Sequence, residues 1–127
     1  MLEDLPRLVN EDAALVRRGK YFTCTFLIGI GDADWLIDVR DGKIEAARPG
    51  PHMMQPWRFA IRAGEDAWYR FWDPEPRPGF HDLFAMTKRG AAVIEGDIAP
   101  LMANLRYVKE VLAKLRAPAK NGSKEDA

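Results

Sequence analysis

The stretch DWLIDVRDGKIEAA, residues 34–47, decides the first half of the predicted fold. Its Asp41-Gly42 dipeptide is typical of a two-residue turn between antiparallel strands. Apolar and polar residues alternate on both sides of this turn, as they do in half-buried strands. The predicted hairpin pairs Arg40 with Lys43, Val39 with Ile44, Asp38 with Glu45 and Ile37 with Ala46. In this register the apolar residues share one face and the charged residues share the other.

The segments on either side of the hairpin give an α+β order. YFTCTFLIGI (21–30) alternates with a period of two, and both of its faces are apolar, which indicates a strand covered on both sides or lining a cavity. After the loop RPGPHMMQP (48–56), WRFAIR (57–62) predicts a strand with Trp57, Phe59 and Ile61 facing one way, and AAVIEGD (91–97) predicts a last strand. Helices are predicted over residues 5–18, 65–72, 80–88 and 98–116, the first capped by Asp4 and the last by Asp97. Strands that come mostly together indicate an antiparallel-rich sheet with helices on one face.

Length and composition predict one folded domain over residues 1–116. The chain has 127 residues, of which 47% are apolar and 30% charged, a profile typical of a folded domain. Residues 117–127 are small and polar, so we expect a disordered C-terminal tail. The 19 basic and 19 acidic side chains balance, which argues against nucleic acid as a partner, since phosphate binding requires a basic excess.

The expected compartment is the cytoplasm. Cys24 is the single cysteine, so no internal disulfide can form. The acidic start of the chain lacks the layout of a signal peptide. No apolar run reaches the roughly 20 residues of a membrane helix, so no integral membrane segment is expected.

An aromatic block falls around a proline-rich loop, in the stretch EDAWYRFWDPEPRPGFHDLFAM (65–86) and just before it. Eight of the 13 aromatic residues lie within 28 residues: Trp57, Phe59, Trp68, Tyr69, Phe71, Trp72, Phe80 and Phe84. They could form ordinary core, a docking surface for a partner, or the wall of a cavity. Met53, Met54, Met86 and Met102 add adaptable apolar surface. A concave apolar site with few polar groups is what a lipid or steroid requires.

Motifs for other chemistry are weak. The chain has no glycine-rich phosphate loop and no nucleophile elbow. His52 and His81 are 29 residues apart and Cys24 stands alone, so neither a metal nor another cofactor is expected. We interpret Cys24 as a buried, inert thiol. His81-Asp82 is a candidate acid–base pair, although neighbours in a helix do not face each other.

The second half of the chain resembles the sterol carrier protein (type 2) domain. The resemblance rests on WRFAIR, EDAWYRFW and FHDLFAMTKRGAAVIEGDIAPLMANLRYVKEVL, with Gly90, Ala91, Val93, Gly96, Asp97, Leu101 and Leu105 at the expected positions. The hairpin DWLIDVRDGKIEAARPG also matches, so the resemblance covers roughly residues 22–112. It departs in the segment DPEPRPG (73–79), which is longer and stiffer than the family's usual connection.

The resemblance implies a curved, mostly antiparallel five-stranded sheet covered on one face by helices, with an apolar tunnel between the layers. It also implies non-catalytic binding and transfer of an apolar ligand: a sterol, a fatty acyl group or an acyl-CoA. The predicted walls of the site are Phe26, Trp68, Phe71, Trp72, Phe80, Phe84, Leu101, Met102 and Leu105. Arg58, Arg62 or Arg70 either meets the acidic head of a ligand or is simply solvated.

Two other function classes stay open. One is a cofactorless isomerase or hydratase that acts on a hydrophobic ketone, with His81 or Asp82 as its base. The other is an interaction module in which the aromatic block forms a homodimer or enzyme-docking face.

Overall fold

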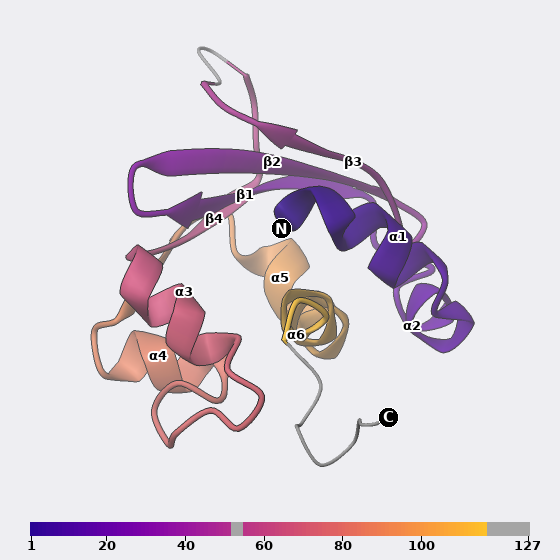
Figure 1. Cartoon of the computed structure of the whole chain (residues 1–127). Helices are drawn as coiled ribbons and strands as arrows, with labels where there is room; N and C mark the ends of the chain where they lie inside the picture. Colours follow the sequence, from indigo (N-terminus) through magenta and orange to yellow (C-terminus); the bar gives the residue numbers. More distant parts are fainter. Residues whose placement is uncertain (52–54, 117–127) are drawn as a thin grey trace.

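An open, curved five-stranded sheet forms one layer of the molecule (Figure 1). The structure is a computed structural model that describes residues 1–51 and 55–116. In sequence the strands are β1 (Cys24–Ile30), β2 (Ala33–Arg40), β3 (Lys43–Pro49), β4 (Phe59–Ala63) and β5 (Ala92–Gly96). Their order across the sheet is β3-β2-β1-β4-β5; β1 and β4 are parallel and the other neighbours are antiparallel. The predicted α+β class and mostly antiparallel sheet are confirmed.

The helices form a second layer on one face of the sheet (Figure 1). They are a short 3₁₀ helix η1 (Leu2–Asp4), α1 (Leu5–Asn10), α2 (Ala13–Arg18), α3 (Glu65–Phe71), α4 (Leu83–Lys88), α5 (Ala99–Ala103) and α6 (Leu105–Ala113). Figure 1 shows α3 and α4 below one end of the sheet, α1 and α2 below the other end, and α6 between the two pairs. The main core lies between the layers and includes Phe26, Ile28, Phe59 and Ile61 from the inner face of the sheet.

The hairpin forms at the predicted turn, but its register was predicted wrongly beyond the second pair. Both turn residues, Asp41 and Gly42, have positive φ angles, as this turn requires. The first two pairs are those predicted, Arg40 with Lys43 and Val39 with Ile44; the next are Asp38 with Ala46 and Ile37 with Ala47. A β-bulge therefore leaves Glu45 as the extra residue of β3.

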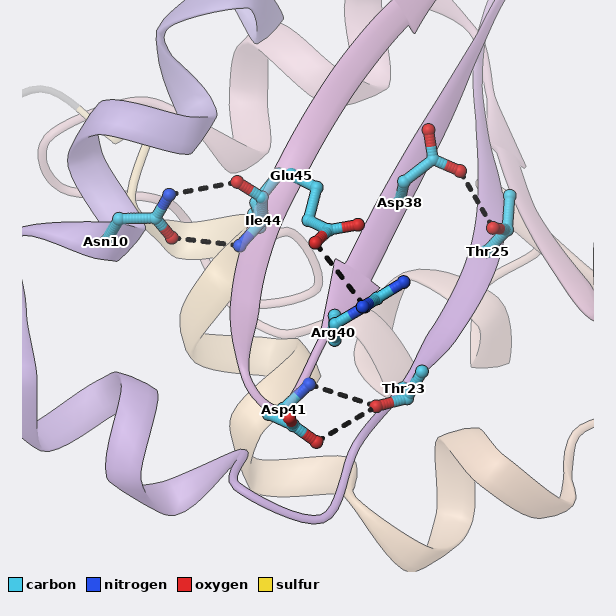
Figure 2. A network of polar contacts seen from close by, with 8 residues as sticks. All are labelled: Asn10, Thr23, Thr25, Asp38, Arg40, Asp41, Ile44 and Glu45. Atoms are coloured by element: carbon cyan, nitrogen blue, oxygen red, sulfur yellow. Dashed lines mark hydrogen bonds and ion pairs between the residues drawn. The ribbon is translucent and has the colours of Figure 1, made fainter.

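The bulge has a physical reason in the packing of β3. It turns both Ile44 and Ala47 toward the main core, which a regular alternation could not do. The side-chain amide of Asn10 in α1 pairs with the backbone of Ile44, donating to its carbonyl at 2.9 Å and accepting from its N–H at 2.8 Å (Figure 2). Glu45 itself is exposed and lies 3.4 Å from the Nε of Arg40.

The single helix predicted over residues 5–18 is two helices. Asp12 adopts an extended conformation between them, and its carboxylate accepts a hydrogen bond from the Leu15 N–H at 3.1 Å. An aspartate that caps the second helix in this way interrupts the first. Asp4, predicted as the cap, makes no capping bond with its side chain, because η1 precedes α1 directly.

The predicted C-terminal helix, residues 98–116, is also divided. Asn104 has non-helical backbone angles, and its side chain donates to the carbonyl of Pro100 at 3.1 Å. This local bond competes with a continuous helix. The N-cap of α5 is Ile98 rather than the predicted Asp97, although the Asp97 carboxylate accepts a hydrogen bond from the Ala99 N–H at 3.1 Å.

Two smaller corrections concern residues 57 and 80–88. Trp57 does not share a face with Phe59: it packs on the outer face of the sheet, against Leu27, Leu36 and Ala60. Because β4 begins at Phe59, Trp57 lies before the strand and does not follow its alternation. The helix predicted from residue 80 begins at Leu83, because the Asp82 carboxylate caps it at the Phe84 N–H. The predicted tail, residues 117–127, and the predicted surface residues Met53 and Met54 lie outside the described residues.

Candidate functional site

A groove of about 380 Å³ lies between the ends of α3 and α4 on one side and α6 on the other. Its apolar lining residues are Phe71, Leu83, Leu105 and Ala113. Its polar and charged lining residues are His81, Asp82, Arg106, Lys109 and Glu110. We call this hollow the α3–α6 groove. Phe71 and Leu83 are almost fully buried, whereas the charged residues are partly or fully exposed, so the groove has an apolar floor and a charged rim.

Helical spacing explains how α6 contributes one wall. Leu105, Lys109 and Ala113 recur every fourth residue and therefore lie along one stripe of the helix. A different face of α6 carries the residues that enter the core: Tyr107, Val108, Val111 and Leu112. On the opposite wall, Phe71 ends α3 and Leu83 begins α4. The small side chain of Ala113 leaves space that a larger residue would fill.

Ion pairs neutralise both carboxylates on the rim. Asp82 Oδ1 lies 2.9 Å from the Nζ of Lys109. Burial alone would raise the pKa of the Asp82 carboxyl, but the hydrogen bond from Lys109 and the backbone N–H groups of α4 outweigh it, so its pKa lies below the usual range. Glu110 pairs with Arg18 of α2 and lies 3.7 Å from the Nε of Arg106. The rim therefore carries no uncompensated negative charge.

Only part of the predicted wall reaches this groove. Phe71 and Leu105 line it, and the ring of Phe84 lies 4.8 Å from the Nζ of Lys109, at its edge. Phe80 instead contacts the guanidinium groups of Arg70 and Arg89, whose Cζ atoms lie 5.3 and 4.5 Å from the centre of its ring. The other four aromatic or leucine residues of the predicted wall are buried in the main core: Phe26, Trp68, Trp72 and Leu101. Met102 is 51% exposed.

Most of the aromatic block is core. The indole N–H of Trp68 donates to the Gly29 carbonyl at 2.9 Å, and that of Trp72 donates to the Leu112 carbonyl at 3.0 Å. These bonds connect α3, and Trp72 directly after it, to β1 and to α6. The two indoles stack on each other with their ring centres 5.1 Å apart. Of the eight residues in the block, Tyr69 alone is strongly exposed, so the block presents no broad apolar face. Whether its members also contact a ligand stays a prediction.

The three arginines considered for an acidic head group all have carboxylate partners. Arg58 pairs with Asp97 at 2.7 Å, and Arg70 pairs with Asp66 at 2.9 Å. Arg62 lies between two carboxylates on the outer face of the sheet, Asp34 and Glu95, each at 3.1 Å. None of the three lines the α3–α6 groove.

The geometry does not favour acid–base or thiol chemistry. No hydrogen bond joins His81 to Asp82, both of which are described; the Nδ1 of His81 accepts from the Gly79 N–H at 3.2 Å. A carboxylate with a lowered pKa, such as Asp82, is a weak general base. Burial raises the pKa of the Cys24 thiol to about 11, which agrees with an inert thiol. Among residues 1–51 and 55–116, no group of three or more His, Cys, Asp or Glu side chains could hold a metal ion.

Sequence reasoning missed five residues of the groove: Leu83, Arg106, Lys109, Glu110 and Ala113. None of these residues was named as a candidate site residue in the sequence analysis. The spacing of residues 105, 109 and 113 was the available signal, because it marks a second stripe beside the apolar one.

In the described part of the chain, no helix combines the length and the apolar character needed to span a bilayer.

Comparison with known proteins supports the fold. No protein-family model and no curated protein matches the sequence. A crystal structure of sterol carrier protein 2 matches with a TM-score of 0.73 and 17% identity, over 93% of this chain and 95% of that one. A Thermus thermophilus protein described as possibly a sterol carrier protein matches with a TM-score of 0.66 and 14% identity, over 95% of this chain and 90% of that one. Sterol carrier protein 2 from Yarrowia lipolytica in its apo form matches with a TM-score of 0.56 and 9% identity, over 91% of this chain and 88% of that one. The chain therefore has a fold like that of sterol carrier protein 2, as the sequence resemblance predicted.

Proposed function

We propose that this protein binds and transfers an apolar molecule of the sterol, fatty acyl or acyl-CoA type, with its apolar part in the α3–α6 groove. The observation that carries the proposal is the apolar floor of that groove, formed by Phe71, Leu83, Leu105 and Ala113. Ligand sites are typically hollows of about 300–1,000 Å³ lined mainly by apolar groups, and a groove of about 380 Å³ falls within that range. The structural likeness to sterol carrier protein 2 supports the same function.

The expected affinity suits a carrier. Ten methylenes removed from water contribute roughly 8 kcal/mol, at about 0.8 kcal/mol each. The loss of motional freedom on binding offsets much of that, which leaves micromolar or weaker affinity. A carrier must also release its ligand, so binding in this range is compatible with transfer. A buried thiol and no disulfide among the described residues fit the reducing cytoplasm in which we place this function.

Binding can be tested on the full chain after removal of bound lipid. The protein is titrated with a 16-carbon fatty acid, its CoA ester and a sterol, and native mass spectrometry measures the fraction of protein in each complex and the number of ligands bound. We expect saturable one-to-one binding of at least one ligand, and recovery of that ligand chemically unchanged. Absence of binding for all three would contradict the proposal, and conversion of the ligand would favour the isomerase or hydratase alternative.

A variant that fills the groove tests the location of the ligand. Leu105→Trp places a larger side chain on a half-buried position of the groove wall. Ala103→Trp places the same side chain on an exposed position of α5, outside the groove. We expect Leu105→Trp to weaken binding about tenfold or more, because the ligand loses several methylene contacts, and Ala103→Trp to bind like the wild type. Equal affinity of both variants would place the ligand elsewhere.

A further inference from the structure

Arg116 is not itself a lining residue of the α3–α6 groove, but its guanidinium contacts the backbone of two residues that are. Its Nε donates to the Phe71 carbonyl at 2.9 Å, and its Nη2 lies 3.4 Å from the carbonyl of His81. Its guanidinium also packs over the ring of Phe71, with the Cζ 4.8 Å from the ring centre. Because Phe71 and His81 both line the groove, the guanidinium of Arg116 lies beside it.

Arg116 differs from the other arginines of the described chain in its surroundings. Seven of them form ion pairs: Arg18, Arg40, Arg48, Arg58, Arg62, Arg70 and Arg106. Four others without an ion pair, Arg7, Arg17, Arg77 and Arg89, are exposed to water. Arg116 is the half-buried guanidinium that has no carboxylate partner within residues 1–51 and 55–116. Burial lowers its pKa, as expected for a cation partly removed from water without a compensating anion, yet a guanidinium stays charged at neutral pH.

The neighbouring charges leave this cation uncompensated. The carboxylate of Asp82 is paired with Lys109, and that of Glu110 is shared by Arg18 and Arg106. A partly buried charge is costly without a partner of opposite sign. Arginine has five N–H donors in a planar fork, and the two backbone contacts use two of them. Donors therefore remain for an oxyanion, which a guanidinium can bind with two parallel hydrogen bonds.

We propose that the ligand is an amphiphile with a carboxylate or phosphate head, and that Arg116 binds this head while the apolar chain follows the groove past Phe71 and Leu105. This inference rests on the proposed function, because it assigns the head group of the ligand in the same groove. Arg116 is then the residue that sets specificity: it favours an anionic chain over a neutral one of equal length. Phe71 joins the two parts of the site, because its ring contacts the guanidinium and lines the apolar groove.

Three ligands with the same 16-carbon chain test this preference on the delipidated full chain: hexadecanoate, hexadecyl phosphate and hexadecanol. We expect one or both anions to bind about ten- to a hundredfold more tightly than the alcohol, since hydrogen bonds to a charged group are stronger than those to a neutral one. Comparing the affinities of hexadecanoate and hexadecyl phosphate identifies which head group is preferred. Equal binding of all three would overturn the assignment of Arg116 and leave the proposed function intact. Failure of all three to bind would overturn the assignment of Arg116, and it would overturn the proposed function as well if the CoA ester and the sterol also fail to bind.

Variants separate the charge of Arg116 from its packing. In Arg116→Gln the preference for the anions should disappear while hexadecanol binds as in the wild type. In Arg116→Lys, which keeps the charge but loses the fork, part of the preference should remain. Arg17→Gln, at an exposed position of α2 without an ion pair, is the matched control and should behave like the wild type. If Arg116→Gln weakens hexadecanol as much as the anions, or leaves the preference unchanged, the proposal is wrong; a melting curve of each variant confirms that it is folded.

Discussion

At the scale of single residues, Asp82 serves the fold and the groove together. Its Oδ2 caps α4 at the Phe84 N–H, and its Oδ1 binds the Nζ of Lys109 across the groove. The sequence identified Asp82 as a candidate base because it follows a histidine. Its observed contacts instead make it a helix cap and an ion-pair partner, because the fold brings Lys109 beside it from a helix more than 20 residues away.

Asp82 should make stability depend on pH in the acidic range. Its pKa in the folded protein lies below that in the unfolded chain, about 3.9, so its stabilising effect is complete above that value and is lost as pH falls through the folded pKa. Asp82→Asn keeps a capping side chain but removes the charge. We expect this variant to be less stable than the wild type at pH 7 by about 1 kcal/mol or less, and the difference to vanish toward pH 2.

Urea unfolding curves between pH 7 and pH 2 measure this difference. The control is Asp32→Asn, at an exposed position in the turn between β1 and β2, which should follow the wild type at every pH. A constant difference between Asp82→Asn and the wild type over the whole range would mean that the ion pair with Lys109 does not stabilise the fold.

At the scale of elements, the hairpin shows what the sequence could predict and where it failed. The turn and its first two pairs follow from Asp41-Gly42 and from the alternation of the strands. The bulge at Glu45 does not, because it depends on contacts with α1 and with the core. The helix breaks at Asp12 and Asn104 were missed for a different reason. The side chains of both residues tend to form hydrogen bonds with nearby backbone groups, which interrupts a helix. The prediction gave more weight to the apolar periodicity of the two segments.

The packing of this hairpin against α2 predicts an unequal effect of two similar substitutions. Gly42 and Gly90 have nearly the same φ, +84° and +81°. A Cβ at Gly42 would clash with the backbone of Val16 and Gly19, whereas at Gly90 it would meet nothing within 4 Å. Both Gly→Ala variants bear the cost of a positive φ, of about 1 kcal/mol. Gly42→Ala should therefore lose clearly more stability than Gly90→Ala.

The free energies of unfolding of these two variants, measured by chemical denaturation, test the contact between the hairpin and α2. A larger loss for Gly42→Ala supports it. Equal losses would show that only the turn conformation matters and that the hairpin does not press on α2.

At the scale of the whole molecule, the layer order was predictable but the groove was not. Strands that come mostly together, with one further strand after the short helices, already indicated the sheet and its helical cover, and the sterol-carrier resemblance supplied the five-stranded arrangement that the structure has. The groove depends on how α6 packs against α3 and α4, which no local pattern specifies. The large aromatic residues were predicted to form the walls of the site, yet Trp68 and Trp72 are buried in the main core. Leu83 and Ala113 are ordinary apolar residues whose role depends on tertiary packing.

The most direct test of the central claim is to locate a bound alkyl chain on the protein. A 16-carbon chain carrying a nitroxide at its apolar end is added to isotope-labelled, delipidated protein, and the broadening of each backbone amide signal is measured by NMR. The account predicts strong broadening at groove residues such as Leu83, Leu105 and Ala113, removed by an excess of unlabelled chain, and little effect at Arg62 and Val93 on the outer face of the sheet. Broadening centred on the outer face, or no saturable broadening at all, would contradict it.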